Sequence, residues 1–201
     1  MFHFHTVKDR KNKILDAAVS LAEEGGFDNV RQRDVAAQAG VALGTLYKRF
    51  RSKEDMLVAA LDREATVLER RMQQTPPKGE TPIERVSAFF TMATRGLVRK
   101  PKYARAMLRA VASGEPELAG RIAVYRGRIA GIIIASLRGA DGADATTQPP
   151  SKHEITLANM LQQFWFAALV GWSAALINER EVGEQTKLAA TLLIRGIALE
   201  D

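Results

Sequence analysis

Residues 41–53, VALGTLYKRFRSK, combine hydroxyl groups and positive charges with a short apolar pattern. Leu46 and Phe50 are four positions apart, which places both on one side of a helix. Thr45, Tyr47 and Lys48 point to its other sides and offer two hydroxyl groups and an ammonium group. A helix with these residues can pack inward on one side and bind an anion, such as a phosphate, on another.

The element that must position this helix lies directly upstream. Val35, Ala36 and Ala39 form another short helical pattern, which ends at Gly40. A glycine between two short helices is typical of a helix-turn-helix, whose second helix enters the DNA major groove. We therefore predict a helix-turn-helix at about residues 31–50. A preceding helix at about residues 8–24 would complete a three-helix head.

The charge distribution agrees with this prediction. The net charge is +6, and residues 1–53 hold 10 Lys and Arg against 6 Asp and Glu, or +4 of the total. A solvated basic surface is the alternative explanation, and charge alone does not decide between the two. Positive charge that coincides with a helix-turn-helix favours a phosphate-binding module.

The remainder of the chain is also predicted to be helical, because apolar residues recur at intervals of three and four. We expect an all-α protein of nine helices in two domains. Residues 1–53 form the helix-turn-helix DNA-binding domain, and residues 54–201 form a helical ligand-binding and dimerisation domain. Ser52, Thr81 and Ser151 are the predicted N-caps of three of the longer helices, each with an acidic residue three positions later.

The helix that begins after Ser151 is expected to run to about Glu179, and the last helix covers residues 182–199. Residues 155–178 contain no charged side chain, and this length could span a bilayer. Asn159, Gln162, Gln163 and Ser173 lie within the stretch, and no basic flank marks one end. We therefore predict a soluble helix, covered on nearly all sides, and no membrane partner.

One of its faces consists of small residues that allow close approach of another helix. This face and the last helix are predicted to meet a second copy of the chain in a four-helix bundle. The alternative is that both faces are buried within one subunit. The predicted interface residues are Ala167, Gly171, Ala174, Ala175, Leu188 and Leu192.

Aromatic residues and a methionine, with a few polar groups among them, would suit a pocket for an apolar ligand. An ordinary hydrophobic core is the alternative for each residue. The candidates are Phe90, Tyr103, Met107, Tyr125, Ile129, Gln162, Trp165 and Phe166.

Several kinds of chemistry have no support in the sequence. The chain has no cysteine, which excludes disulfides, thiolate zinc sites and a cysteine nucleophile. The three histidines, His3, His5 and His153, form no metal-binding pattern, and neither a Gly-x-Ser-x-Gly elbow nor a phosphate-binding glycine loop occurs. We expect no enzymatic activity, cofactor or metal. The absence of a signal sequence at the N-terminus predicts a cytoplasmic protein.

The motif-bearing residues of the head resemble those of TetR-family transcriptional regulators. The similarity covers about 45 residues and comprises Ile14-Leu-Asp-Ala-Ala, Gly26-Phe, Val35-Ala36, Ala39-Gly40-Val41, Gly44-Thr-Leu-Tyr47, Phe50 and Lys53. It implies a homodimer whose heads enter successive major grooves, and a tail whose small-molecule ligand changes the spacing of the heads. In matching members, the positions of Thr45, Tyr47 and Lys53 contact phosphates, whereas Leu43, Gly44 and Lys48 approach bases or backbone.

The chain departs from the common family pattern at two places. Ala42 replaces the usual serine or threonine cap of the recognition helix, a loss of roughly 1 kcal/mol of local stability. Arg31 and Gln32 stand where threonine and valine are common, and both could reach DNA. The sequence ALGTLY at residues 42–47 is similar to the branch of actinobacterial sterol-catabolism repressors.

Together these features predict a ligand-responsive repressor, most simply a homodimer that an apolar small molecule releases from a double-stranded DNA operator. The resemblance suggests an effector of the lipid or acyl-coenzyme A type. Two alternatives belong to other classes. One is an architectural DNA-binding protein without an inducer, and the other is an α-helical binding protein or enzyme that acts on an apolar ligand.

Overall fold

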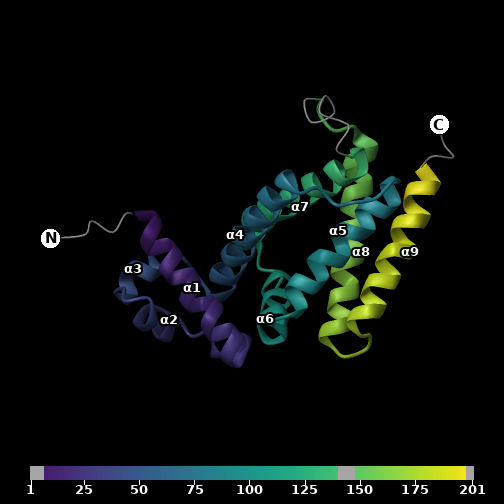
Figure 1. Cartoon of the computed structure of the whole chain (residues 1–201). Helices are drawn as coiled ribbons and strands as arrows, with labels where there is room; N and C mark the ends of the chain where they lie inside the picture. The colour runs from purple at the N-terminus through teal and green to yellow at the C-terminus, as the bar shows by residue number, and fades with distance from the viewer. Residues whose placement is uncertain (1–6, 140–147, 198–201) are drawn as a thin grey trace. The chain divides into compact units, whose positions relative to one another are not determined.

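The structure of the chain, a computed structural model, describes residues 7–139 and 148–197. These residues form nine α-helices and two short 3-10 helices, and they contain no strand (Figure 1). The predicted all-α fold is therefore confirmed. The elements are α1 Val7–Gly25, η1 Phe27–Asn29, α2 Gln32–Gln38, α3 Leu43–Tyr47, α4 Lys53–Gln74, α5 Pro82–Val98, α6 Pro101–Val111, η2 Pro116–Leu118, α7 Ala119–Arg138, α8 Lys152–Ser173 and α9 Glu179–Ile197.

The predicted N-caps are present. The Thr81 hydroxyl accepts a hydrogen bond from the Glu84 amide at 3.2 Å, and the Ser151 hydroxyl accepts one from the Glu154 amide at 3.1 Å. Both glutamates accept a bond from the backbone in return, which completes a capping box at the start of α5 and of α8. The Ser52 hydroxyl likewise accepts from the Asp55 amide at 3.1 Å and caps α4.

The predicted end of α8 is wrong, because this helix stops at Ser173 and not near Glu179. The Leu176 amide donates to the Gly171 carbonyl and the Ala175 amide to the Trp172 carbonyl, both at 3.0 Å, which is a Schellman motif. Ala175 occupies the left-handed position of the motif with φ 59°. Glycine usually fills this position, so an alanine gave no stop signal in the sequence.

The chain folds into two compact units, and it passes from one to the other within α4, between α5 and α6, and within α7. Of the described residues, the first unit holds 7–64 and 100–123, and the second holds 65–99, 124–139 and 148–197. The first unit thus contains more than the expected residues 1–53, because α6 contributes to its core.

The core of the first unit joins α1 to α4 with α6. Its members are buried apolar side chains from all of these helices, including Ile14, Leu15, Ala18, Val35, Leu46, Phe50, Met56, Leu57, Tyr103, Ala106 and Met107. Polar contacts tie α6 to the end of α1. The Lys102 ammonium donates to the Glu24 carbonyl at 2.7 Å, and Lys100 forms an ion pair with Glu23.

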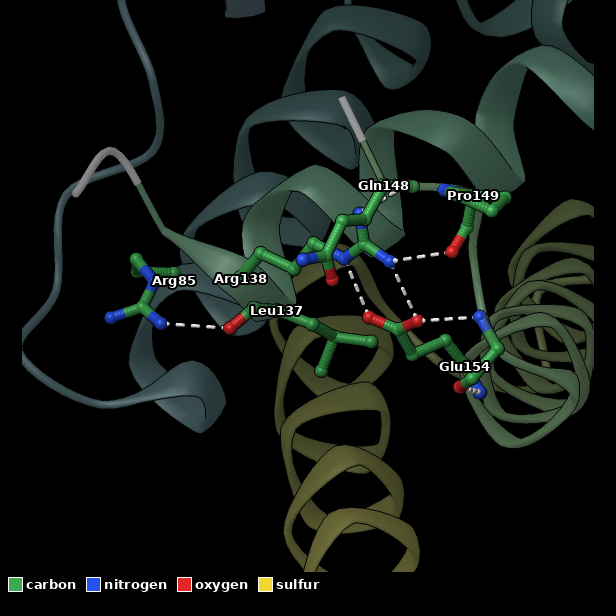
Figure 2. Close-up of polar contacts among 7 residues, drawn as sticks. Arg85, Leu137, Arg138, Gln148, Pro149 and Glu154 are labelled. Carbon is green, nitrogen blue, oxygen red and sulfur yellow. Dashed lines mark hydrogen bonds and ion pairs between the residues drawn. The ribbon is translucent and has the colours of Figure 1, made fainter. Parts of the chain in front are cut away.

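In the second unit, α9 packs against both α5 and α8 (Figure 1). Two arginines hold the end of α7, as Figure 2 shows. Arg85 donates to the carbonyls of Ser136 at 2.9 Å and Leu137 at 2.8 Å, which are free acceptors at a helix C-terminus. Arg138 binds both carboxylate oxygens of Glu154, at 2.7 and 2.8 Å. These hydrogen bonds lower the pKa of Glu154 to about 2.

Candidate nucleic-acid interface

The helix-turn-helix forms where the sequence predicted it. The Val41 amide donates to the Ala36 carbonyl at 3.0 Å and the Gly40 amide to the Ala37 carbonyl at 3.1 Å, so α2 also ends in a Schellman motif. Gly40 has φ 63°, a conformation that glycine adopts without steric cost. The α3 helix then starts at Leu43, and its N-cap residue Ala42 makes no side-chain capping bond, as its methyl group requires.

The side chains of α3 separate into a buried and an exposed side. Leu46 in α3 and Phe50, three residues after its end, are 0% and 1% exposed and belong to the core of the first unit. Tyr47 is 51% exposed, although it lies between Leu46 and Lys48 in the sequence. Gly44 and Lys48 are exposed as well, and Thr45 is half-buried at the edge of this surface. The Tyr47 phenol, the Lys48 ammonium group and the Gly44 backbone therefore all lie on the exposed surface of the first unit.

The other three predicted DNA contacts around the helix-turn-helix lie in different surroundings. Arg31 is exposed at the N-cap of α2. Gln32 is half-buried, and its amide donates to the Arg51 carbonyl at 3.3 Å, which links α2 to the turn before α4. Leu43 is half-buried and packs against the hydrophobic core, so only part of its side chain faces outward.

Lys53, the last of the eight candidates, is half-buried, and its ammonium group already has partners within the protein. Its ammonium nitrogen lies 4.0 Å from the ring centroid of Phe27, 3.7 Å from the Asp28 carboxylate and 3.5 Å from the Phe27 carbonyl. The Arg109 guanidinium of α6 shares both partners, at 4.1 Å from the same ring centroid and 3.2 Å from the Asp28 carboxylate. These contacts fix the start of α4 relative to η1 and α6. The sequence analysis missed Arg109 and Asp28, because contacts between residues 81 positions apart leave no local pattern.

An ion pair between a buried carboxylate and a half-buried guanidinium lies at the junction between α3 and α4. Asp55 is 6% exposed, and one of its carboxylate oxygens lies 2.6 Å from Nε of Arg121 in α7. The other oxygen accepts a hydrogen bond from the Arg51 amide at 3.0 Å. The Arg121 guanidinium also lies over the Phe50 ring, 5.8 Å from its centroid. This pair holds the chain that leaves α3 on a fixed path, and the sequence analysis did not identify it.

The eight candidate pocket residues are divided between the two units. Tyr103 and Met107 belong to the core of the first unit, where both are nearly fully buried. Burial raises the pKa of Tyr103 and that of the neighbouring Glu64 carboxyl. The other six lie in the second unit: Phe90, Ile129, Gln162 and Trp165 are buried, and Tyr125 and Phe166 are half-buried.

Within the second unit, an aromatic pair occupies the interior between α5 and α8. The ring centroids of Phe90 and Trp165 are 5.4 Å apart and tilted by 50°. The Trp165 indole nitrogen donates to the Thr94 hydroxyl at 2.9 Å, which fixes the orientation of the indole. Thr94 also lines an open pocket of about 600 Å³ between α5 and the start of α9. Arg95, Arg180, Glu184 and Lys187 are among its other walls, and none of them was a predicted ligand residue.

The predicted dimer interface residues lie on α8, on the turn after it and on α9. Leu188 and Leu192 are 59% and 64% exposed, and Ala167 is exposed. Gly171 is half-buried, whereas Ala174 and Ala175 are exposed in the Schellman turn and not in the helix. The large apolar side chains of Met160, Phe164 and Val170 are also exposed on α8.

The described residues exclude some other kinds of site. They contain no group of three or more acidic or histidine side chains that could hold a metal ion. His153 is an exposed residue in the first turn of α8, and His3 and His5 lie outside the described residues. No helix in the described ranges is both long enough and apolar enough to cross a membrane.

Comparison with known proteins extends the similarity to both units. Residues 14–60 match a family model described as bacterial regulatory proteins, tetR family, and residues 79–193 match one described as a tetracyclin repressor-like C-terminal domain. The HTH-type transcriptional repressor KstR of Rhodococcus jostii is 31% identical over 93% of this chain and 84% of its own length. Its counterpart from Mycolicibacterium smegmatis is 30% identical over 93% of this chain and 88% of its own length.

Solved structures show the same fold. A TetR transcriptional regulator from Rhodococcus sp. RHA1 matches with a TM-score of 0.80 and 26% identity, over 94% of this chain and 96% of its own. The regulator FadR from Bacillus subtilis, in complex with stearoyl-CoA, matches with a TM-score of 0.66 and 20% identity, over 92% and 98%. FadR from Thermus thermophilus, in complex with lauroyl-CoA, matches with a TM-score of 0.72 and 18% identity, over 92% and 94%.

Proposed function

Because this chain belongs to the TetR family of bacterial regulatory proteins and is a transcriptional repressor, not an enzyme, we propose how it performs that role. In our proposal it is a cytoplasmic homodimer that binds a partly palindromic operator and is released by an apolar small molecule. Residues 1–53 bind DNA, and residues 54–201 bind the effector and form the dimer.

The exposed side of α3 is the observation that carries the DNA-binding proposal. Tyr47 and Lys48 are exposed next to Leu46 and Phe50, which are buried in the core, so the backbone that carries them is held in place before DNA binds. Exposed hydroxyl and ammonium groups suit phosphate oxygens, and contacts to phosphates set the register of a protein on the duplex. The proposed contact residues are Arg31, Gln32, Leu43, Gly44, Thr45, Tyr47, Lys48 and Lys53.

The exposed apolar side chains of α8 and α9 support the homodimer. Phe164 and Val170 are each 40% exposed, and Leu188 and Leu192 are more exposed still. Met160, which is also exposed, lies four positions before Phe164 on α8, and Leu188 lies four positions before Leu192 on α9, so each pair shares one side of its helix. The two helices pack against each other. A second copy of the chain would cover such a surface by pairing its own two helices with it, as a four-helix bundle.

The interior of the second unit supports an apolar effector. Phe90, Ile129 and Trp165 are buried aromatic and aliphatic side chains of this unit, and the Gln162 amide is buried in the same unit. Two proteins of the same fold, the FadR regulators named above, were solved with stearoyl-CoA and lauroyl-CoA. We therefore propose a lipid or acyl-coenzyme A type of effector. Regulation requires this molecule to bind one conformation of the protein more tightly than the other.

Selection from a pool of randomised duplexes, followed by titration with an effector, tests the proposal. We expect the protein to retard a selected, partly palindromic duplex. Its affinity for this duplex should be about 10³-fold or more above its affinity for random DNA at the same salt concentration. Increasing salt should weaken both complexes. Addition of stearoyl-CoA should then release the selected duplex.

DNA binding, sequence specificity and the effector class can each be refuted separately. Failure to retard any duplex in dilute buffer would refute DNA binding through α3. Equal affinity for random and selected DNA would instead indicate an architectural protein. If the operator complex forms but neither stearoyl-CoA nor lauroyl-CoA alters it, the acyl-coenzyme A class of effector is wrong.

A further inference from the structure

Gln162, in the middle of α8, is a buried polar residue whose side chain lacks a partner. It is 4% exposed, and neither its amide nitrogen nor its amide oxygen has a hydrogen-bond partner among the described residues. The other buried polar side chains of the second unit all have one. Thr94 accepts from Trp165 at 2.9 Å, Ser136 donates to the Ile132 carbonyl at 2.8 Å, and Thr186 donates to the Val182 carbonyl at 2.7 Å.

The surroundings of Gln162 make this arrangement unfavourable for the protein alone. Ala158 and Trp165 lie four positions before and three positions after it, so the three residues share one face of α8. Both neighbours are buried, as are Leu161 and Leu169. An amide removed from water without a hydrogen bond destabilises the fold, whereas methionine would fill the same space at no such cost. A group of this kind in a native interior calls for an explanation, and a bound ligand is one that can be tested.

The chemistry of the site defines the molecule that would satisfy it. An amide offers both donors and an acceptor, and it carries no charge. The described residues of the second unit include no buried charged side chain, since the buried Asp55 belongs to the first unit. A carboxylate or phosphate at Gln162 would therefore lack a counter-charge and would bear a large desolvation penalty. A keto, hydroxyl or ester oxygen meets no such penalty.

The aromatic neighbours limit the rest of the molecule to apolar groups. The Trp165 indole nitrogen is already bonded to Thr94, so this residue presents only its apolar ring, 5.4 Å from that of Phe90. We infer that Gln162 recognises a neutral, oxygen-bearing group on an otherwise apolar effector, through hydrogen bonds from and to its amide. This inference rests on the proposed function, in which the effector binds inside the second unit.

Replacement of Gln162 by methionine tests whether its amide binds a ligand or stabilises the fold. Without any added ligand, Q162M should unfold about 2–8 °C above the wild-type protein, because the unpartnered amide is gone. T186V is the matched control, since it removes a buried polar group that already has a partner within α9. A lower unfolding temperature for Q162M would show that the amide already has a stabilising partner, which would overturn the inference.

Ligand binding supplies the second readout. The probes are dodecan-2-one, dodecan-1-ol and dodecanoate, which share an alkyl chain and differ in charge and oxygen chemistry. The wild-type protein should bind the ketone and the alcohol about 5–10-fold more tightly than dodecanoate, and Q162M should lose this preference while T186V retains it. Equal or tighter binding of dodecanoate, unchanged affinities in Q162M, or no binding of the ketone and the alcohol would each overturn the inference.

Operator binding distinguishes failure of the inference about Gln162 from failure of the proposed function. Q162M should still retard the selected duplex, because Gln162 lies in the second unit and α3 lies in the first. If wild type and Q162M both release the operator equally with stearoyl-CoA, the repressor function stands and the role of Gln162 is wrong. If neither protein retards the duplex, the proposed function itself fails.

Discussion

Removal of Arg121 should reveal how strongly the first turn of α7 stabilises the junction between α3 and α4. In R121L, the Asp55 carboxylate keeps its hydrogen bond from the Arg51 amide but loses the guanidinium 2.6 Å away. Asp55 is 6% exposed, so little water can replace the lost partner. The result is a buried charge at the start of the helix that follows the recognition helix.

The expected loss of unfolding free energy follows from the burial and the remaining hydrogen bond of Asp55. Breaking a fully buried ion pair typically costs about 3–5 kcal/mol. The Arg121 side chain is 34% exposed, so solvent already weakens the pair, and the Arg51 amide remains. We therefore expect R121L to lose about 2 kcal/mol of unfolding free energy. D55N should lose about 1 kcal/mol, because the asparagine oxygen still accepts from Arg51 and the half-exposed arginine can turn to water.

Urea unfolding of the two single variants and the double variant measures the pair directly. A change in midpoint without a change in slope reports stability, and the double-mutant cycle should give a coupling of about 1 kcal/mol. R180L is the control, because it breaks the exposed Arg180–Glu184 pair and should leave the midpoint unchanged. A coupling of zero, or an R121L midpoint equal to that of wild type, would refute the assignment of the buried pair as the stabilising contact.

Three further predictions concern other parts of the molecule. Y47A should weaken binding to selected and random duplexes alike, by about 5–10-fold in gel-shift titrations at fixed salt, because the exposed phenol is proposed to contact phosphate; a loss confined to the selected duplex would contradict this. The pKa of Glu154 is about 2 in the folded protein and 4.5 in the unfolded chain, so its bond to Arg138 should stabilise the protein above about pH 4.5, and that stability should be lost as the pH falls towards 2. Acid unfolding of E154Q should therefore depend less on pH in this range, and an unchanged profile would be the contrary result. Glutamates at both Leu188 and Leu192 should shift the protein from dimer to monomer in analytical ultracentrifugation with unchanged helical content, whereas a persistent dimer would place the interface elsewhere.

Local signals explain most of what could be predicted about the fold. The turn at Gly40 and the capping boxes at Thr81 and Ser151 depend on hydrogen bonds that span five residues or fewer, so their residue types are visible in a short stretch of sequence. The burial of Leu46 and Phe50 is equally local, because the two residues are four positions apart and the Phe50 amide donates to the Leu46 carbonyl. The missed end of α8 shows the limit of such signals, since Ala175 adopts a conformation that glycine normally marks.

The sequence by itself therefore determined the helical class, the position of the helix-turn-helix and the outward direction of Tyr47. The tertiary structure alone decided which distant residues meet: Lys53 and Arg109 at Phe27, Asp55 with Arg121, and Tyr103 in the core of the first unit. The physical reason is that periodicity and capping reflect neighbours along the chain, whereas these contacts depend on how whole helices pack. The unpartnered amide of Gln162 is likewise a feature that only the tertiary structure decided, because burial without a partner depends on how the interior packs.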